Sequence, residues 1–130
     1  MMRLLIDTHC WLWWLGAPER LRDSSRRLIA NHDNEVLFSA ASSWEIAIKI
    51  ALGKLHLPSP VEQYVPDRLA RNAMGALPVE HIHALRVATL PLHHGDPFDR
   101  LLVAQCQVEN LPLLTADRQF SPYDIEILPA

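Results

Sequence analysis

Acidic residues stand beside apolar runs at several points along the chain. Asp7 directly follows Leu-Leu-Ile, and Asp117 comes two residues after Leu-Leu-Thr. Glu45 ends the segment Ser-Ser-Trp-Glu, and the stretch Asp-Pro-Phe-Asp holds Asp96 and Asp99. Carboxylates that share one cleft raise each other's pKa and oppose folding unless a cation neutralises them. Carboxylate oxygens suit Mg²⁺ or Mn²⁺, so these acids are candidates for a metal site.

The elements around these acids are predicted to alternate between strand and helix. Short apolar runs bounded by turn residues indicate buried strands, and amphipathic or capped segments indicate helices. Strands are expected over residues 3–6, 35–39, 76–78, 113–115 and 125–128. Helices are expected over residues 8–15, 19–31, 42–52, 61–72, 80–89 and 97–110, and Ser42 or Ser43 can cap the third of them. This alternation predicts an α/β fold with a parallel central sheet flanked by helices on both faces.

The predicted sheet brings the acids toward one edge. Asp7 and Asp117 follow the first and fourth strands, and parallel sheets bind ligands beyond the carboxyl ends of their strands. Glu45 is expected in the first turn of the helix entered from the second strand. Asp96 and Asp99 are expected at the start of the helix that leads into the fourth strand. From there Asp99 can point back toward the strand ends, which favours one shared site.

Each acid also has a purely structural explanation. Asp7 and Asp117 could each cap the helix or turn that follows. Glu45 lies four residues before Lys49, a spacing that forms favourable ion pairs on a helix. Asp96 precedes a proline, which is typical of a helix N-cap. These explanations account for single residues but not for several acids at one end of one sheet.

Composition limits the class of protein. The 130 residues fit one domain, spanning 1–130, and 49% hydrophobic with 21% charged residues is a globular composition. A net charge of −3 does not suggest a protein that coats nucleic acid, although a local basic rim still allows nucleic acid as a substrate. Cys10 and Cys106 are expected to be buried, reduced thiols. No apolar run approaches the length of a membrane span, so we expect a soluble, cytoplasmic protein.

Four segments in series resemble the motifs of PIN-domain ribonucleases, above all the VapC-type toxins of prokaryotic type II toxin–antitoxin pairs. The segments are Leu-Leu-Ile-Asp-Thr-His, Ser-Ser-Trp-Glu-Ile-Ala-Ile-Lys, Asp-Pro-Phe-Asp-Arg-Leu-Leu-Val-Ala-Gln and Leu-Leu-Thr-Ala-Asp. They occur in the family's order and cover nearly the whole chain. The resemblance implies that the catalytic acids are Asp7, Glu45, Asp99 and Asp117. It makes Asp7 and Asp99 the metal ligands, with Glu45, Asp117 and Asp96 in support.

The family resemblance also implies a cofactor and partners. It implies a Mg²⁺- or Mn²⁺-dependent endoribonuclease that forms a homodimer. It further implies a small VapB-like antitoxin whose C-terminal segment lies across the active-site groove. The expected chemistry is hydrolysis of an RNA phosphodiester by a water that the metal activates. One position departs from the pattern, because His9 stands where the family often carries Asn or another small polar residue.

Other residues are candidates for binding the substrate. Arg100 and Arg118 each follow a candidate ligand, and a guanidinium can form paired hydrogen bonds with phosphate. Ordinary solvation at the surface is the alternative for both. His93 or His94 could touch phosphate at the rim of the cleft. The four tryptophans are expected to pack in the core, and a protein interface or stacking on RNA bases are the alternatives. They are Trp11, Trp13, Trp14 and Trp44.

Two other functions compete with a nuclease. A metal-dependent phosphatase could use Asp7 as its nucleophile, although such enzymes of the haloacid dehalogenase type carry a second Asp where this chain has His9. A non-catalytic domain could instead use the acids as a regulatory cation site. Metal-dependent cleavage of RNA by the pure protein separates these functions.

Overall fold

Five parallel strands form one central sheet in the computed structural model, which describes all residues 1–130. The strands are β1 Arg3–Ile6, β2 Glu35–Ser39, β3 Gly75–Leu77, β4 Leu113–Thr115 and β5 Ile127–Pro129. Their spatial order is β3-β2-β1-β4-β5, and each neighbouring pair is parallel. The chain therefore builds outward from β1 to β3, crosses back, and continues on the other side of β1. This order makes the gap between β1 and β4 the point where the winding direction changes.

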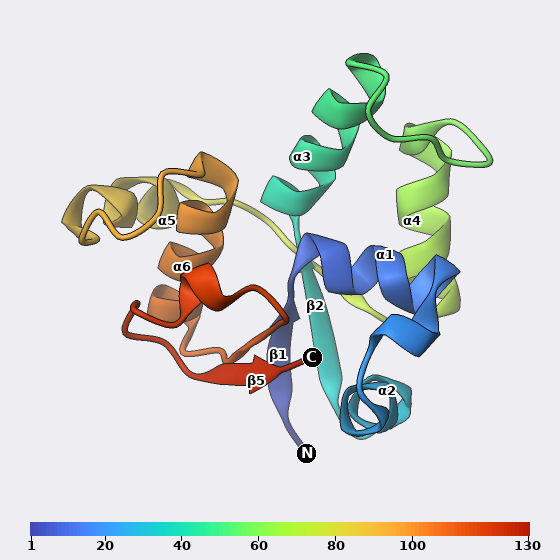
Figure 1. The fold of residues 1–130 in the computed structure, drawn as a ribbon, viewed down its shortest axis with the longest axis horizontal. Coiled ribbons are helices and arrows are strands. Elements are labelled where there is room, and N and C mark those ends of the chain that lie inside the picture. The colour runs from blue at the N-terminus through green and yellow to red at the C-terminus, as the bar shows by residue number, and fades with distance from the viewer.

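Helices cover both faces of this sheet, as the sequence predicted (Figure 1). They are α1 Thr8–Gly16, α2 Asp23–Ala30, α3 Ala40–Ala51, α4 Val61–Arg71, α5 His81–Arg86 and α6 Pro97–Glu109. Helices α1, α2 and α4 lie on one side of the strands and α5 and α6 on the other, while α3 rises from the end of β2. None of these helices has the length and apolar character that crossing a membrane requires.

The alternation of side chains along β1 divides the core into two layers. Leu4 and Ile6 join the cluster under α1, α2 and α4, and Leu5 joins the cluster under α6. All three side chains are fully buried. In the first layer the Trp11 ring stacks on Phe38 with 4.3 Å between centroids. The continuous apolar run of β1 is thus explained by burial of the strand on both faces.

The structure corrects the predicted start of α3. The sequence predicted a cap at Ser42 or Ser43, but α3 begins at Ala40, directly after β2. Ser39 is the cap, since its hydroxyl accepts a hydrogen bond from the Ala41 amide at 3.0 Å. The same hydroxyl donates to the side-chain carbonyl of Gln105 on α6 at 2.5 Å. Glu45 therefore lies in the second turn of α3 and not in the first.

Three other elements differ from the prediction by more than one residue at an end. The expected helix 19–31 is a short 3-10 turn, Pro18–Arg20, followed by α2, because Leu21 adopts an extended conformation and buries its side chain. The expected helix 80–89 ends at Arg86 and continues as a 3-10 turn, Val87–Thr89. The last strand is shifted to Ile127–Pro129, where it pairs with β4 in register.

The cap of α3 supplies a first prediction. Ser39→Ala removes the N-cap and leaves a buried Gln105 oxygen without its donor, so the free energy of unfolding should fall by about 2–3 kcal/mol. Urea denaturation followed by circular dichroism measures this loss. Ser43→Ala is the matched control and should change stability by less than about 0.5 kcal/mol. A larger loss in Ser43→Ala than in Ser39→Ala would contradict the assignment of the cap.

Candidate active site

Asp7 combines the cap of α1 with a buried position at the carboxyl end of β1. Its side chain is 6% exposed. One carboxylate oxygen accepts from the His9 amide at 2.9 Å, and the other accepts from the Thr115 hydroxyl at 2.5 Å. Burial raises the pKa of Asp7, the hydrogen bonds from Thr115 and His9 lower it, and the nearby charge of Asp117 raises it. The predicted cap is therefore present, and it holds a carboxylate whose ionisation is opposed by its surroundings.

Thr115 connects the ends of β1 and β4. Its hydroxyl donates to Asp7 and accepts from the Asp117 amide at 3.0 Å. The Asp117 side chain in turn accepts from the Gln119 amide at 2.9 Å, which caps the 3-10 turn Arg118–Phe120. These bonds fix two acids on either side of the point where the winding of the sheet reverses. A ligand site at this place agrees with the rule for open parallel sheets.

Asp99 reaches this place from the first turn of α6. Asp96 caps that helix, because its side chain accepts from the Phe98 and Asp99 amides at 2.9 and 3.1 Å. The Asp99 carboxylate contacts the His94 Nε2 atom at 2.7 Å, and both side chains are largely buried. Burial is the main cause that raises the pKa of Asp99 to about 7. The charges of Asp96 and Asp7 raise it further, and the hydrogen bond with His94 lowers it.

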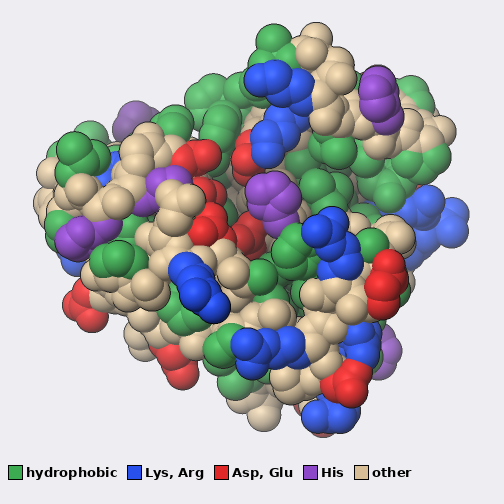
Figure 2. Space-filling model, in the orientation of Figure 1, with side chains coloured by type: hydrophobic (Ala, Val, Ile, Leu, Met, Phe, Trp, Pro, Cys, Tyr) green, Lys and Arg blue, Asp and Glu red, His purple; other side chains and the backbone are tan.

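His94, Asp99 and Asp117 present one ligand atom each within 4.8 Å of one another. Asp7 lies close enough to act on the charges of Asp99 and Asp117. We call these four residues the acid cluster. Figure 2 shows red acidic side chains gathered in a hollow at the centre of the view, with blue Lys and Arg side chains around it. Crowded carboxylates that resist ionisation are the environment that a divalent cation relieves, so the donor set fits Mg²⁺ or Mn²⁺.

Glu45 lies on a buried face of α3. Its side chain is buried, and its carboxylate pairs with the Lys49 ammonium at 3.0 Å, as the structural explanation predicted. One turn earlier on the same face of α3, the Ser42 hydroxyl accepts a 2.7 Å hydrogen bond from Thr8. This contact turns the Glu45 face of α3 toward the residue that follows Asp7. Glu45 does not belong to the group of ligand atoms within 4.8 Å.

The two candidate phosphate-binding arginines occupy different environments. The Arg100 guanidinium donates to the carbonyl oxygens of Pro91 and Val87 at 2.9 and 3.2 Å and to the Tyr123 hydroxyl at 3.2 Å. It therefore fastens the loop before α6, a structural role that the sequence interpretation did not include. Arg118 lines a pocket of about 290 Å³ together with Asp117 and Arg22.

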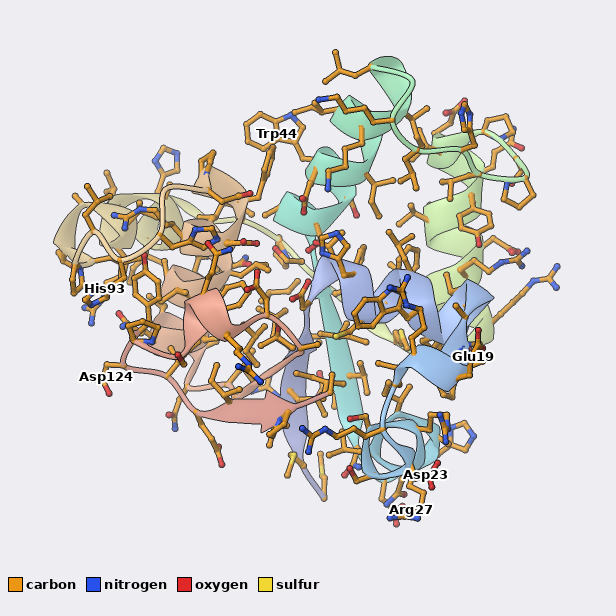
Figure 3. The ribbon with its side chains drawn as sticks, in the orientation of Figure 1. Glu19, Asp23, Arg27, Trp44, His93 and Asp124 are labelled. Carbon is orange, nitrogen blue, oxygen red and sulfur yellow. The ribbon has the colours of Figure 1, made fainter.

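Two residues of this site have roles that the sequence does not predict. The sequence indicates Thr115 only as the end of a strand, and its position two residues before Asp117 is the one available signal. It indicates His94 only for the cleft rim, together with His93. The structure separates the two histidines, because the His93 ring packs against Tyr123 at 5.1 Å and lies at the outer end of the molecule (Figure 3).

Known proteins share this fold and sequence pattern. Ribonuclease VapC16 of Mycobacterium tuberculosis is 46% identical over 61 residues, which are 47% of this chain and only 43% of that protein. Ribonuclease VapC22 of the same organism is 29% identical over 119 residues, 92% of this chain and 90% of that protein. The crystal structure of VapBC2 from Rickettsia felis, bound to a promoter DNA fragment, has a TM-score of 0.72 at 15% identity. That match covers 98% of this chain and 97% of the other.

The family model that matches the chain spans almost all of the elements described above. It is the model of the PIN domain, and it covers residues 4–126, from β1 to the residue before β5. The matched region contains Asp7, Glu45, Asp99 and Asp117. With this match and with the parallel sheet that carries its acids at the β1–β4 switch point, the chain belongs to the PIN domain family.

Proposed function

We propose that this protein is a divalent-metal-dependent endoribonuclease of the VapC type, the toxin of a type II toxin–antitoxin pair, and that residues 1–130 form one nuclease domain. The observation that carries this proposal is the meeting of Asp7, Asp99 and Asp117 at the switch point of the sheet. The names of the two similar ribonucleases from Mycobacterium tuberculosis support the choice of RNA as the substrate.

The residues of the site have distinct roles in this proposal. Asp7 and Asp99 hold the cation, with Asp117, Glu45 and His94 in support and Asp96 acting mainly as the cap of α6. A bound Mg²⁺ or Mn²⁺ supplies a water of lowered pKa and positive charge for the oxygens of the phosphate. Thr115 orients the Asp7 carboxylate and the Asp117 amide, and His94 orients Asp99. Arg118 is the better placed of the two arginines to contact a substrate phosphate, because Arg100 is engaged by the loop before α6.

Metal dependence of RNA cleavage tests the proposed activity. The purified protein should cleave a labelled single-stranded RNA in Mg²⁺ or Mn²⁺, lose that activity in EDTA, and regain it when the metal is returned in excess. RNA that stays intact under all conditions would contradict the proposal. Formation of a phosphoenzyme with a small phosphomonoester would favour the phosphatase. Binding of metal without any turnover would favour the regulatory cation site.

Thr115 allows a second prediction about metal binding. Thr115→Val keeps the branched shape of the side chain but removes the hydroxyl that orients Asp7. The affinity for Mn²⁺ should fall by about 10- to 100-fold, the usual effect of losing a residue that orients a metal ligand. Isothermal titration calorimetry measures this change. Thr115→Ser retains the hydroxyl and should bind within about threefold of the original protein, whereas equal losses in both variants would contradict an orienting role.

The proposed toxin requires partners. The similar structures include toxin–antitoxin complexes, which supports a small VapB-like antitoxin as the partner of this chain. A homodimer is supported by the exposed apolar side chains Ile82 and Leu85 on α5, which are 58% and 71% exposed. Expression of the chain should arrest growth, and the small reading frame next to its gene should relieve that arrest. Light scattering of the purified protein measures the oligomeric state.

A further inference from the structure

A pocket of about 260 Å³ adjoins the acid cluster on the α1 side and has no role in the activity proposed above. Its lining residues are Asp7, His9, Cys10, Trp13, Ala116 and Asp117. Asp7 and Asp117 are shared with the acid cluster, so the pocket opens beside the place where the scissile phosphate would lie. The other four residues supply two rings and two small side chains. The pocket therefore combines a carboxylate edge with apolar and aromatic walls.

The aromatic wall of this pocket is held in place by its neighbours. The Arg20 guanidinium lies 4.8 Å from the centre of the Trp13 ring, and Trp13 also packs against the buried core. The His9 ring lies 6.4 Å from Trp13 and is tilted by 43° to it. The His9 Nδ1 atom lies 3.9 Å from the Asp7 carboxylate, and the His9 side chain is 60% exposed. A fixed indole loses little conformational freedom when a flat ligand binds against it.

The charge of the pocket restricts what can enter it. No Lys or Arg side chain lines it to bind a phosphate, and the buried Cys10 thiol, whose pKa burial raises to about 12, stays neutral. A flat, uncharged ring needs no cationic partner and can stack on the indole of Trp13. Basic side chains line the neighbouring pocket, which shares Ala116 and Asp117 with this one and also contains Arg22 and Arg118. A base and a phosphate thus have separate pockets that meet at Asp117.

We infer that the pocket of His9, Cys10 and Trp13 binds one RNA nucleobase next to the cleaved phosphodiester, with the base stacked on Trp13. This inference rests on the proposed ribonuclease activity and adds a base-binding subsite to it. Stacking accepts any base, because each base presents a flat π face. The subsite therefore positions one nucleotide of a single strand and excludes a base within a duplex, whose faces are already covered by stacked neighbours.

Trp44 is the competing aromatic platform and provides a matched control. It is 60% exposed, and its indole projects from α3 on the α6 side of the molecule (Figure 3). It packs edge-on against Phe98 at 5.1 Å but lines none of the pockets beside the acids. If an exposed tryptophan were sufficient to bind a base, changing Trp44 would have the same effect as changing Trp13.

The test first removes single bases from the RNA and then compares protein variants on the same RNAs. A short single-stranded RNA with one cleavage site is compared with RNAs that carry one abasic ribose at each position around that site. We expect kcat/KM to fall by about 5- to 100-fold at one position adjacent to the cleaved bond and by no more than about twofold elsewhere. The Trp13→Ala variant should cleave the intact RNA and that abasic RNA equally. Trp44→Ala should retain the full difference between the two RNAs. Trp13→Phe keeps a smaller ring and should reduce the difference without abolishing it, which carries the test if Trp13→Ala does not fold.

Binding separates failure of the subsite from failure of the ribonuclease. The Asp7→Asn variant is expected not to cleave RNA, so its binding to the same RNAs can be measured in Mg²⁺. Fluorescence anisotropy of the labelled RNA gives the affinity. If the RNA is cleaved but no abasic position lowers kcat/KM, the subsite is overturned and the ribonuclease stands. Base-dependent binding without cleavage by the original protein would overturn the ribonuclease and retain the subsite.

The protein variants give further outcomes. Base dependence that survives in Trp13→Ala, or that is lost in Trp44→Ala, would also overturn the subsite. Weakened antitoxin binding with unchanged RNA kinetics in Trp13→Ala would assign the pocket to a protein partner and overturn the subsite.

Discussion

Asp7→Asn should abolish RNA cleavage while leaving the fold intact. Asp7 is the acid with the most connections in the cluster, since it lies at the end of β1, caps α1 and accepts from Thr115. Asn is as good a helix cap as Asp, since its one oxygen can accept from the His9 amide while its amide group donates to the Thr115 hydroxyl. What it removes is the negative charge that the cation needs. Loss of residues that merely orient a ligand costs about 10- to 100-fold, so loss of the ligand should exceed about 100-fold in kcat/KM.

The measurement combines cleavage of labelled RNA with thermal unfolding of the same preparation. Asp33→Asn provides a matched control, because Asp33 is an exposed acid in the turn before β2. It should retain full activity. An Asp7→Asn protein that unfolds at a lower temperature than the control and loses activity in proportion would point to a structural role only. Undiminished cleavage by the variant would remove Asp7 from the site.

The position of the acids was predictable because a small number of physical rules is sufficient to determine it. Short apolar runs buried on both faces identify β1 and β4, and parallel strands place their carboxyl ends at one edge. Asp7 and Asp117 follow those strands directly, so their meeting needed no knowledge of side-chain contacts. The proline after Asp96 marked the start of α6 equally well. The aim of Asp99 toward the strand ends then followed from the helical geometry.

The contacts that tune these acids were not predictable from local sequence. The Thr115 hydroxyl and the Asp7 carboxylate are 108 positions apart, and only the pairing of β1 with β4 brings them together. The start of α3 depends likewise on Gln105 of α6, which fixes Ser39 on the face of the sheet that α6 covers. Local capping preferences favoured Ser42 and Ser43 just as strongly. Tertiary contact decided between equivalent local signals, and this moved Glu45 by a turn.

Asp99→Asn should make the metal-free protein more stable at pH 8. Burial raises the pKa of Asp99 to about 7, and the ordinary value of an Asp carboxyl is 3.8. Between these values the folded protein binds a proton that the unfolded chain has released, so the free energy of unfolding falls as the pH rises. The cost is complete above about pH 7, where the folded state must hold a buried charge beside Asp7 and Asp96. The Asn side chain carries no charge and can still accept a hydrogen bond from His94.

Removing this cost should raise the Tm in EDTA at pH 8 by about 3–8 °C, or about 1–2 kcal/mol, and change it little at pH 4. The Tm of the variant should still fall with rising pH, but less steeply than that of the original protein, because burial also raises the pKa of Asp7. Mg²⁺ should reverse the order of the two proteins at pH 8, since it stabilises the folded state that binds it and the substituted amide offers it no charge. Thermal unfolding across pH, with and without Mg²⁺, measures both effects, and Asp124→Asn, an exposed acid outside the cluster, is the control. A variant that is destabilised at pH 8 in EDTA would show that Asp99 contributes to the fold as a charge. A stabilised variant would show instead that the charge is retained at a cost in stability, which only a bound cation offsets.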